Sequence, residues 1–367
     1  MRGVAKAPGE CGLLFIAPTL GTGGAERQWA TLLPALAEKG LAPHVIALAK
    51  GGQFADELQN AGVPVEILGC GAGSAVVCGV ARALRQRPRV IITMGTNANL
   101  VGVIGAKLGR AEHIVNWHVQ ADKPLRLRRR AIMRLCARLG SSVIAVTEAQ
   151  SAQLKSLGFA PEAITIIGNG TAVPKPVREP AETRKLLGIQ PTTSLVLGVG
   201  RLSPEKKFGR FIDAIACLRA RGVAVAGVIA GDGPERDTLE RQIRRSGGGT
   251  LLLGARADVA DLYAAADVLC MTSDLEALPM VILEAFASRL PVVVPAVGGI
   301  SELIDDGKEG VVVREQSPVA YADGIVRVIG GSKIEEMRRA AYSAYAARFT
   351  DATMVGLYID RLTAADS

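Results

Sequence analysis

Residues 268–285 read VLCMTSDLEALPMVILEA and hold the pattern on which the fold of this chain depends. The apolar run Val268–Met271 predicts a short strand that is buried on both faces. Polar residues follow, and Pro279 then precedes an apolar helical pattern, as is typical of a proline at the start of a helix. The stretch therefore predicts a strand, a loop and a helix, the repeating unit of a parallel sheet.

The same alternation of strand and helix runs through the rest of the chain. The first half has seven further strand candidates: Gly12–Ala17, His44–Leu48, Val63–Leu68, Val90–Met94, His113–Trp117, Ser142–Val146 and Ile164–Ile167. The second half adds five: Leu195–Val199, Val225–Ile229, Thr250–Leu253, Val292–Val294 and Val311–Val313. Amphipathic stretches such as Ala25–Lys39 and Asn97–Leu108 lie between the strands, as right-handed crossovers require. The expected fold class is α/β, with two doubly wound, Rossmann-like domains on parallel sheets.

A proline-rich segment marks the expected domain boundary. Residues 172–181 read AVPKPVREPA and show no periodicity, which is typical of a stiff linker. We therefore expect domains at 1–171 and 182–345. The remaining residues, 346–367, include a helical pattern at Ala352–Thr363, and we expect this last helix to pack back on the first domain.

Composition excludes several classes of protein. The 367 residues are 49% hydrophobic and 21% charged, which is typical of a globular protein and not of a disordered one. The six cysteines form no C-x-x-C pair, so we expect reduced thiols and a cytoplasmic location, and no zinc ribbon. No apolar run approaches the ~18 residues that span a bilayer, and Leu13–Ala17 is too short for a signal peptide.

The positive charge is concentrated in the first half of the chain. Residues 1–180 hold 21 Lys and Arg against 11 Asp and Glu, whereas the remainder is slightly acidic. The densest basic stretch, residues 123–139, reads KPLRLRRRAIMRLCARL. In a helix, an arginine stripe and an apolar stripe run side by side: Arg126, Arg130, Arg134 and Arg138, and Ile132, Leu135, Cys136 and Leu139. Such a helix can lie on an anionic membrane surface, or can be a solvated outer helix. Nucleic acid is not expected, because no aromatic platform accompanies the arginines.

Glycines and cations follow several expected strands. The turn after the first strand includes Gly23 and Gly24 in a G-x-G-G pattern, which suits phosphate or sugar contact, or a tight turn, and not a dinucleotide site. Residues 198–207, GVGRLSPEKK, bring Arg201 and Lys206 out of a loop at the carboxyl end of a strand, where phosphate binds in such sheets; a solvated basic loop is the alternative. Gly231 and Gly233 predict either close backbone approach or an ordinary turn.

The segment quoted first holds two carboxylates. Glu276 precedes the predicted helix, and Glu284 lies within it among apolar residues, where an unpaired charge is costly. Carboxylates accept hydrogen bonds from the vicinal hydroxyls of ribose and hexoses. Backbone N–H groups at a helix start can bind a diphosphate, and here Met280 and Val281 would supply them. Leu278 and Pro279 are expected to line the same donor site. A capping acid and a surface charge are the structural alternatives.

Taken in order, these motifs resemble the retaining nucleotide-sugar glycosyltransferases of the GT-B fold (group 1, glycosyltransferase family 4-like). Glu276 and Glu284 are similar to the Glu-x7-Glu motif of that family, and Arg201 with Lys206 to its G-R-x-x-x-E-K segment. Further similar stretches are Gly23–Glu26, Ala145–Glu148, Gly168–Gly170, Gly231–Pro234 and Gly298–Gly307. The resemblance runs from about Leu13 to Phe349; Ala277 departs from it, because glycine is common there.

The resemblance implies a role for each matching residue. Arg201 and Lys206 would hold the donor diphosphate, Glu284 the ribose hydroxyls, and Glu276 would face the donor sugar. His118 matches a histidine that lies near the sugar and the leaving phosphate. The donor would bind to the second domain and the acceptor to the first, across a cleft. Neither a cofactor nor a metal is implied, since no Asp-x-Asp motif lies near these elements. The acceptor would be a lipid-linked or polysaccharide-precursor hydroxyl. It would attack the donor sugar at the face that the diphosphate leaves, so that the anomeric configuration is retained.

Two other functions stay open. A nucleotide-sugar 2-epimerase uses the same architecture, although Glu-x7-Glu and the Arg201–Lys206 pair disfavour it. A non-catalytic nucleotide-sugar-binding protein is the other alternative. The base, the sugar and the acceptor are not determined by these motifs.

Overall fold

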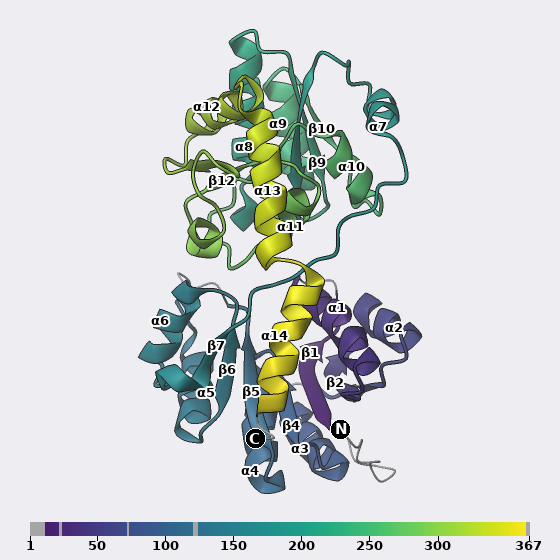
Figure 1. Ribbon diagram of the computed structural model, residues 1–367, viewed down its shortest axis with the longest axis vertical. Helices are drawn as coiled ribbons and strands as arrows, with labels where there is room; N and C mark the ends of the chain where they lie inside the picture. Colours follow the sequence, from purple (N-terminus) through teal and green to yellow (C-terminus); the bar gives the residue numbers. More distant parts are fainter. Residues whose placement is uncertain (1–11, 22–23, 72, 120–123, 365–367) are drawn as a thin grey trace. The chain divides into compact units, whose positions relative to one another are not determined.

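Two compact units make up the computed structural model, which describes residues 12–21, 24–71, 73–119 and 124–364 (Figure 1). The first unit runs to Gly170 and resumes at Asp351, and the second is Thr171–Thr350. Each unit contains one parallel sheet with helices around it, so the expected class of two Rossmann-like α/β domains is confirmed. Residues 172–181, the expected linker, lie in the second unit.

The first unit is built on a seven-stranded sheet in the order β3-β2-β1-β4-β5-β6-β7. Its strands are β1 Leu13–Thr19, β2 Pro43–Lys50, β3 Val65–Ile67, β4 Val90–Thr93, β5 Glu112–Trp117, β6 Ser142–Ala145 and β7 Ile164–Ile166. Its helices are α1 Gly24–Glu38, α2 Gln53–Asn60, α3 Ala75–Gln86, α4 Thr96–Gly109, α5 Leu127–Arg138 and α6 Glu148–Ser156. Strands β1 and β4 are mostly apolar and almost fully buried, as a sheet covered on both faces requires.

The last helix, α14 (Asp351–Thr363), also belongs to the first unit. Its buried Met354, Tyr358 and Leu362 join the core formed by β1 and α1. Asn116 on β5 donates to the Tyr358 hydroxyl at 2.8 Å, and Arg361 pairs with Glu112 at 2.6 Å. Figure 1 shows this helix, in yellow, alongside α1 and β5. Thus the end of the chain completes the core of the unit in which the chain starts.

The second unit is built on a six-stranded sheet in the order β10-β9-β8-β11-β12-β13. Its strands are β8 Ser194–Val199, β9 Val225–Ala230, β10 Thr250–Leu252, β11 Val268–Cys270, β12 Val292–Pro295 and β13 Gly310–Val313. Its helices are α7 Pro180–Leu186, α8 Phe208–Ala220, α9 Arg236–Arg245, α10 Val259–Ala265, α11 Met280–Ala287, α12 Pro318–Ile329 and α13 Ile334–Arg348. All thirteen strands expected from the sequence occur, with ends that differ by one or two residues.

The basic helix differs from its expected form. It begins at Leu127, and Arg126 precedes it in an extended conformation. The prediction that Leu135 belongs to the apolar stripe was wrong, because Leu135 is 38% exposed. Met133 is buried instead, together with Ile132 and Cys136. The reason is that α5 packs with its Met133 side against Asn99 of α4, which turns Leu135 away from the core.

Three buried polar side chains of the first unit, Thr93, His113 and Ser141, are linked by hydrogen bonds. The His113 Nε2 lies 2.9 Å from the Thr93 hydroxyl, and its Nδ1 lies 2.8 Å from the Ser141 hydroxyl. Burial lowers the pKa of His113 to about 3. The imidazole is therefore neutral in the folded protein at any pH above about 3, whereas in the unfolded chain it titrates near ~6.5.

We predict that His113 makes folding stability depend on pH. As pH falls from about 6.5 towards 3, His113 is protonated in the unfolded chain but not in the folded protein. The free energy of unfolding therefore falls by about 1 kcal/mol per pH unit. Urea unfolding of the parent and of His113→Gln at pH 4.5–7 measures this. The variant is expected to be less stable at neutral pH but to show a shallower slope. His44→Gln is the comparison and is expected to change the slope less: burial lowers the pKa of that histidine as well, but its side chain is 24% exposed. An unchanged slope in His113→Gln would contradict the assignment.

Candidate functional site

The site predicted in the second unit lies where the direction of the sheet's connections changes. The chain runs from β8 outward through β9 and β10, and then returns to β11, which pairs with β8 on its other side. The loops that leave β8 and β11 therefore diverge at the carboxyl edge of the sheet. In doubly wound sheets this is the point where ligands bind. Lys206 lies after β8 and Glu276 after β11.

Lys206 and Glu276 form an ion pair at this point. The Lys206 Nζ lies 2.6 Å from Oε1 of Glu276, although 70 residues separate the two in the chain. Glu276 is only 6% exposed, so the pair is partly shielded from water. Two residues that the sequence predicted for one site are thus in direct contact.

Backbone contacts tie the two loops together around this pair. The Thr272 hydroxyl lies within hydrogen-bond distance of the carbonyl oxygens of Lys206 and Lys207, at 3.1 and 3.0 Å. The Asp274 N–H donates to the Glu205 carbonyl oxygen at 2.9 Å. The site geometry is therefore held by the protein itself and does not require a ligand to assemble it.

Arg210 on α8 supports the same loop, and sequence reasoning missed it. Its guanidinium donates to the Thr272 carbonyl oxygen at 2.8 Å and to Oδ1 of Asp274 at 3.0 Å. It also lies over the Tyr321 ring, 5.9 Å from the centroid. The signal in the sequence was only one more arginine on an amphipathic helix, because each of its partners lies more than 60 residues away.

The glycines of the motifs lie where another loop crosses close by. Gly231 has φ +154°, and a Cβ there would lie inside the van der Waals radius of the Gly200 carbonyl oxygen. Gly233 comes similarly close to the Leu202 backbone, and Gly298, at φ +53°, to the carbonyl oxygen of Glu276. Only residues without a side chain allow these loops to approach in this way.

Helix α11 begins where its sequence predicts, with Pro279 as the residue before it. Leu278 and Pro279 are buried, whereas Met280 and Val281 are half-buried at the first turn. The positive end of the helix dipole lies at this turn. The cation Arg201 is exposed in the loop after β8.

Glu284 on α11 is a buried carboxylate and not a surface charge. It is 6% exposed, and the Tyr263 hydroxyl donates to its Oε2 at 2.8 Å. Tyr263, on α10, is itself 2% exposed. Sequence reasoning missed this tyrosine, because nothing in the local pattern of α10 points to a partner 21 residues ahead.

The remaining candidate residues belong to the first unit. His118 follows β5, and its Nε2 is buried with no hydrogen-bond partner among the described residues. Burial lowers the pKa of His118 to about 4, so the imidazole is neutral near pH 7. Gly24 is the first residue of α1, and Gly23 lies outside the described residues. Arg126, Arg130, Arg134 and Arg138 are all exposed.

Two family models match this chain. The model for the glycosyl transferase 4-like domain matches residues 23–170, and the model for glycosyl transferases group 1 matches residues 193–330. Among curated proteins, the α-D-kanosaminyltransferase of Streptomyces kanamyceticus is 33% identical over 160 residues, which are 42% of this chain and 41% of that protein. The putative teichuronic acid biosynthesis glycosyltransferase TuaC of Bacillus subtilis is 35% identical over 149 residues, 40% of this chain and 36% of that protein. The match thus spans less than half the length of these relatives.

Solved structures match over nearly the whole chain. HepE of Anabaena, in complex with UDP, is 25% identical, with a TM-score of 0.86 over 96% of this chain and 100% of that one. Sucrose-phosphate synthase of Thermosynechococcus elongatus is 18% identical, with a TM-score of 0.78 over 96% and 100%, which shows the fold alone. The two-sheet architecture, the family models and these structures agree: the chain belongs to the group 1 glycosyltransferases of the GT-B fold.

Proposed function

We propose that this protein transfers a sugar, with retention, from a nucleoside-diphosphate sugar to an acceptor hydroxyl. The observation that carries the proposal is the contact of Lys206 with the buried Glu276 at the switch point of the second sheet. A cation beside a carboxylate suits a donor that presents a diphosphate next to sugar hydroxyls. The similarity to HepE, which was solved with UDP and with UDP-glucose, supports a nucleotide-sugar donor.

Binding of the donor divides among three groups in this proposal. Arg201 and Lys206 bind the diphosphate, together with the first turn of α11. Glu284 accepts hydrogen bonds from the ribose hydroxyls. Glu276 lies next to Lys206 and accepts from the donor sugar, so the phosphate and sugar ends of the donor are held at neighbouring side chains.

The reaction then proceeds at the face that the diphosphate leaves. The acceptor oxygen bonds to the anomeric carbon as the bond from that carbon to the phosphate oxygen breaks, and the departing phosphate takes the hydroxyl proton. Arg201 and Lys206 neutralise the charge that develops on the diphosphate, which is the role that metal ions play in other transferases. The resemblance assigns His118 a place near the sugar, where a neutral imidazole can donate one hydrogen bond without repelling the cations.

The acceptor in this proposal is lipid-linked or a polysaccharide precursor, and the enzyme is a peripheral protein of an anionic, inner membrane surface. Its basis is the exposed arginines at 126, 130, 134 and 138, with Leu127 and Leu135 exposed on the same helix. Among the described residues, no helix is both long and apolar enough to pass through a bilayer.

We predict that Glu276→Gln and Lys206→Ala each leave the protein folded but lower kcat on the order of 10²–10³-fold, because each removes one preorganised charge at the reacting donor. Steady-state kinetics and thermal melts of the purified variants measure this. Glu240→Gln and Lys185→Ala are controls in the same unit: Glu240 is half-buried and pairs with Arg236 at 3.1 Å, and Lys185 is exposed. Turnover within a fewfold of the parent would reject the assigned roles.

We also predict that turnover survives thorough chelation, because Arg201 and Lys206 supply the neutralising charge. The rate is measured after dialysis against EDTA, and again after Mg²⁺ or Mn²⁺ is added. A complete loss that either ion restores would overturn the metal-independent mechanism.

Finally, we predict that the parent sediments with anionic liposomes at low salt and not with neutral ones. Each arginine near an anionic surface contributes roughly 1 kcal/mol, and salt weakens the attraction as it shortens the Debye length. Changing Arg126, Arg130, Arg134 and Arg138 to Gln is expected to abolish sedimentation. As control, Arg241, Arg244, Arg245 and Arg339 in the second unit are changed to Gln, which removes the same charge from other exposed sites. If the parent does not sediment with anionic liposomes at low salt, α5 is a solvated helix and the proposed membrane contact is wrong.

A further inference from the structure

We infer that Tyr263 is a positioning residue for Glu284, and that through it the protein prefers ribonucleotide donors over 2′-deoxyribonucleotide donors. The inference rests on the proposed function, because it takes Glu284 as the group that binds the ribose. It adds a residue that the motif Glu-x7-Glu does not contain, and a selectivity that can be measured without any acceptor.

The hydrogen bond between the two side chains is buried at both ends. Tyr263 is 2% exposed and Glu284 is 6% exposed, and the hydroxyl of the first lies 2.8 Å from Oε2 of the second. A phenol has one hydrogen to donate. If the carboxylate turned away, this buried hydrogen bond would be broken, which is unfavourable. Tyr263 therefore restrains the rotation of the Glu284 carboxylate.

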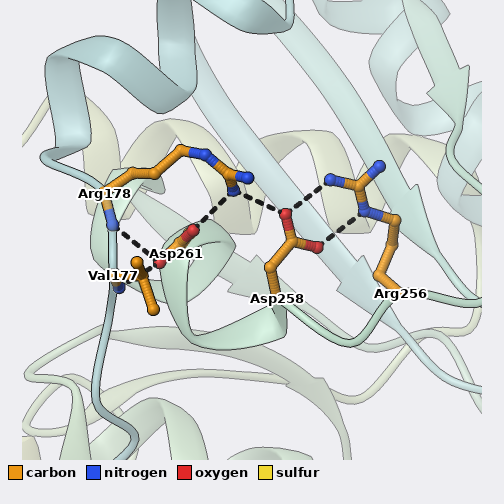
Figure 2. A network of polar contacts seen from close by, with 5 residues as sticks. All are labelled: Val177, Arg178, Arg256, Asp258 and Asp261. Carbon is orange, nitrogen blue, oxygen red and sulfur yellow. Dashed lines mark hydrogen bonds and ion pairs between the residues drawn. The ribbon is translucent and has the colours of Figure 1, made fainter.

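Tyr263 can hold this position because its helix is fixed at the beginning. Figure 2 shows the network around Asp258, which precedes α10, and Asp261 within it. Arg256 binds Asp258 through two hydrogen bonds of 2.7 and 2.6 Å, and Arg178 lies 2.8 Å from both aspartates. The Arg256 hydrogen bonds, with Arg178, lower the pKa of Asp258 to about 2, so Asp258 stays charged at any physiological pH.

The backbone of the segment that enters the second unit joins the same network. The N–H groups of Val177 and Arg178 donate to Oδ1 of Asp261, at 2.6 and 3.2 Å. Asp261 is 1% exposed, and its carboxylate is shared between these amides and the Arg178 guanidinium. The first turn of α10 is therefore anchored to a chain segment more than 80 residues away in sequence.

The other end of α10 is fixed as well. Arg184 on α7 donates to the Ala265 carbonyl oxygen at 2.9 Å and pairs with Asp267 at 2.6 Å. A helix of only seven residues that is held at both ends has little freedom to shift, so the tyrosine in its middle presents its hydroxyl to Glu284 from a fixed point. This support makes the phenol a positioning group and not only a filler of the core.

A restrained carboxylate recognises ribose through both of its vicinal hydroxyls. The 2′- and 3′-hydroxyls each donate one hydrogen bond, and a 2′-deoxyribose supplies only one. A site built to accept a hydroxyl loses affinity for the analogue that lacks it, provided that the acceptor cannot turn to another partner. We therefore expect the preference for ribose to depend on Tyr263.

The test measures binding of nucleoside diphosphates by calorimetry. The probes are UDP, GDP, ADP and CDP and their 2′-deoxy counterparts, with the parent, Tyr263→Phe and the control Tyr345→Phe. Tyr345 is a matched buried tyrosine of the same unit, 4% exposed, whose hydroxyl donates to the Thr171 carbonyl oxygen. The parent is expected to prefer its ribonucleotide by about 10-fold or more, and Tyr263→Phe to reduce that ratio at least about threefold. Tyr345→Phe should leave the ratio unchanged.

The ratio separates positioning from a merely structural role, because a general loss of packing weakens both nucleotides equally. A second comparison uses Glu284→Ala, in which adding Tyr263→Phe should change the ratio no further if the tyrosine acts through Glu284. A parent-like ratio in Tyr263→Phe would overturn the inference while leaving the proposed function intact. A parent that binds none of the nucleotides would contradict the proposed function itself.

Discussion

The ion pair between Lys206 and Glu276 is the interaction on which the second unit's site depends, because it joins the two loops that diverge at the switch point of the sheet. Two charges at 2.6 Å in a partly buried position must be held by their surroundings, since the loss of either partner leaves the other poorly solvated. Thr272, Asp274 and Arg210 provide that support through the loop backbone. The glycines at 231 and 298 leave room for the loops to meet.

The second carboxylate of the motif is held by a different principle. Glu284 lies on α11, among apolar residues, and is oriented by a phenol from a neighbouring short helix and not by a cation. Asp258 and Asp261, at the beginning of this short helix, pair with arginines and so fix it. The two glutamates, eight positions apart, therefore have separate environments, which suits separate tasks in donor binding.

The first unit uses buried neutral groups where the second uses charges. His113 and His118 are neutral near pH 7 because burial lowers the pKa of each imidazole. The densest positive charge of the first unit lies on the exposed arginines at α5. Desolvation thus keeps the two buried histidines neutral, whereas the arginines of α5 lie in water.

The sequence by itself determined the α/β class, all thirteen strands and the start of α11, because strand burial, helix periodicity and the position of Pro279 are local properties of the chain. The resemblance of its motifs to the family also brought Lys206 and Glu276 into one predicted site. Only the tertiary structure decided that these two side chains touch, that Arg210 supports their loop, and that Tyr263 holds Glu284. The exposure of Leu135 was likewise decided by the packing of α5 on α4. The physical reason is the same in each case: these contacts join residues far apart along the chain or on different elements, and periodicity carries no information about which element will lie opposite.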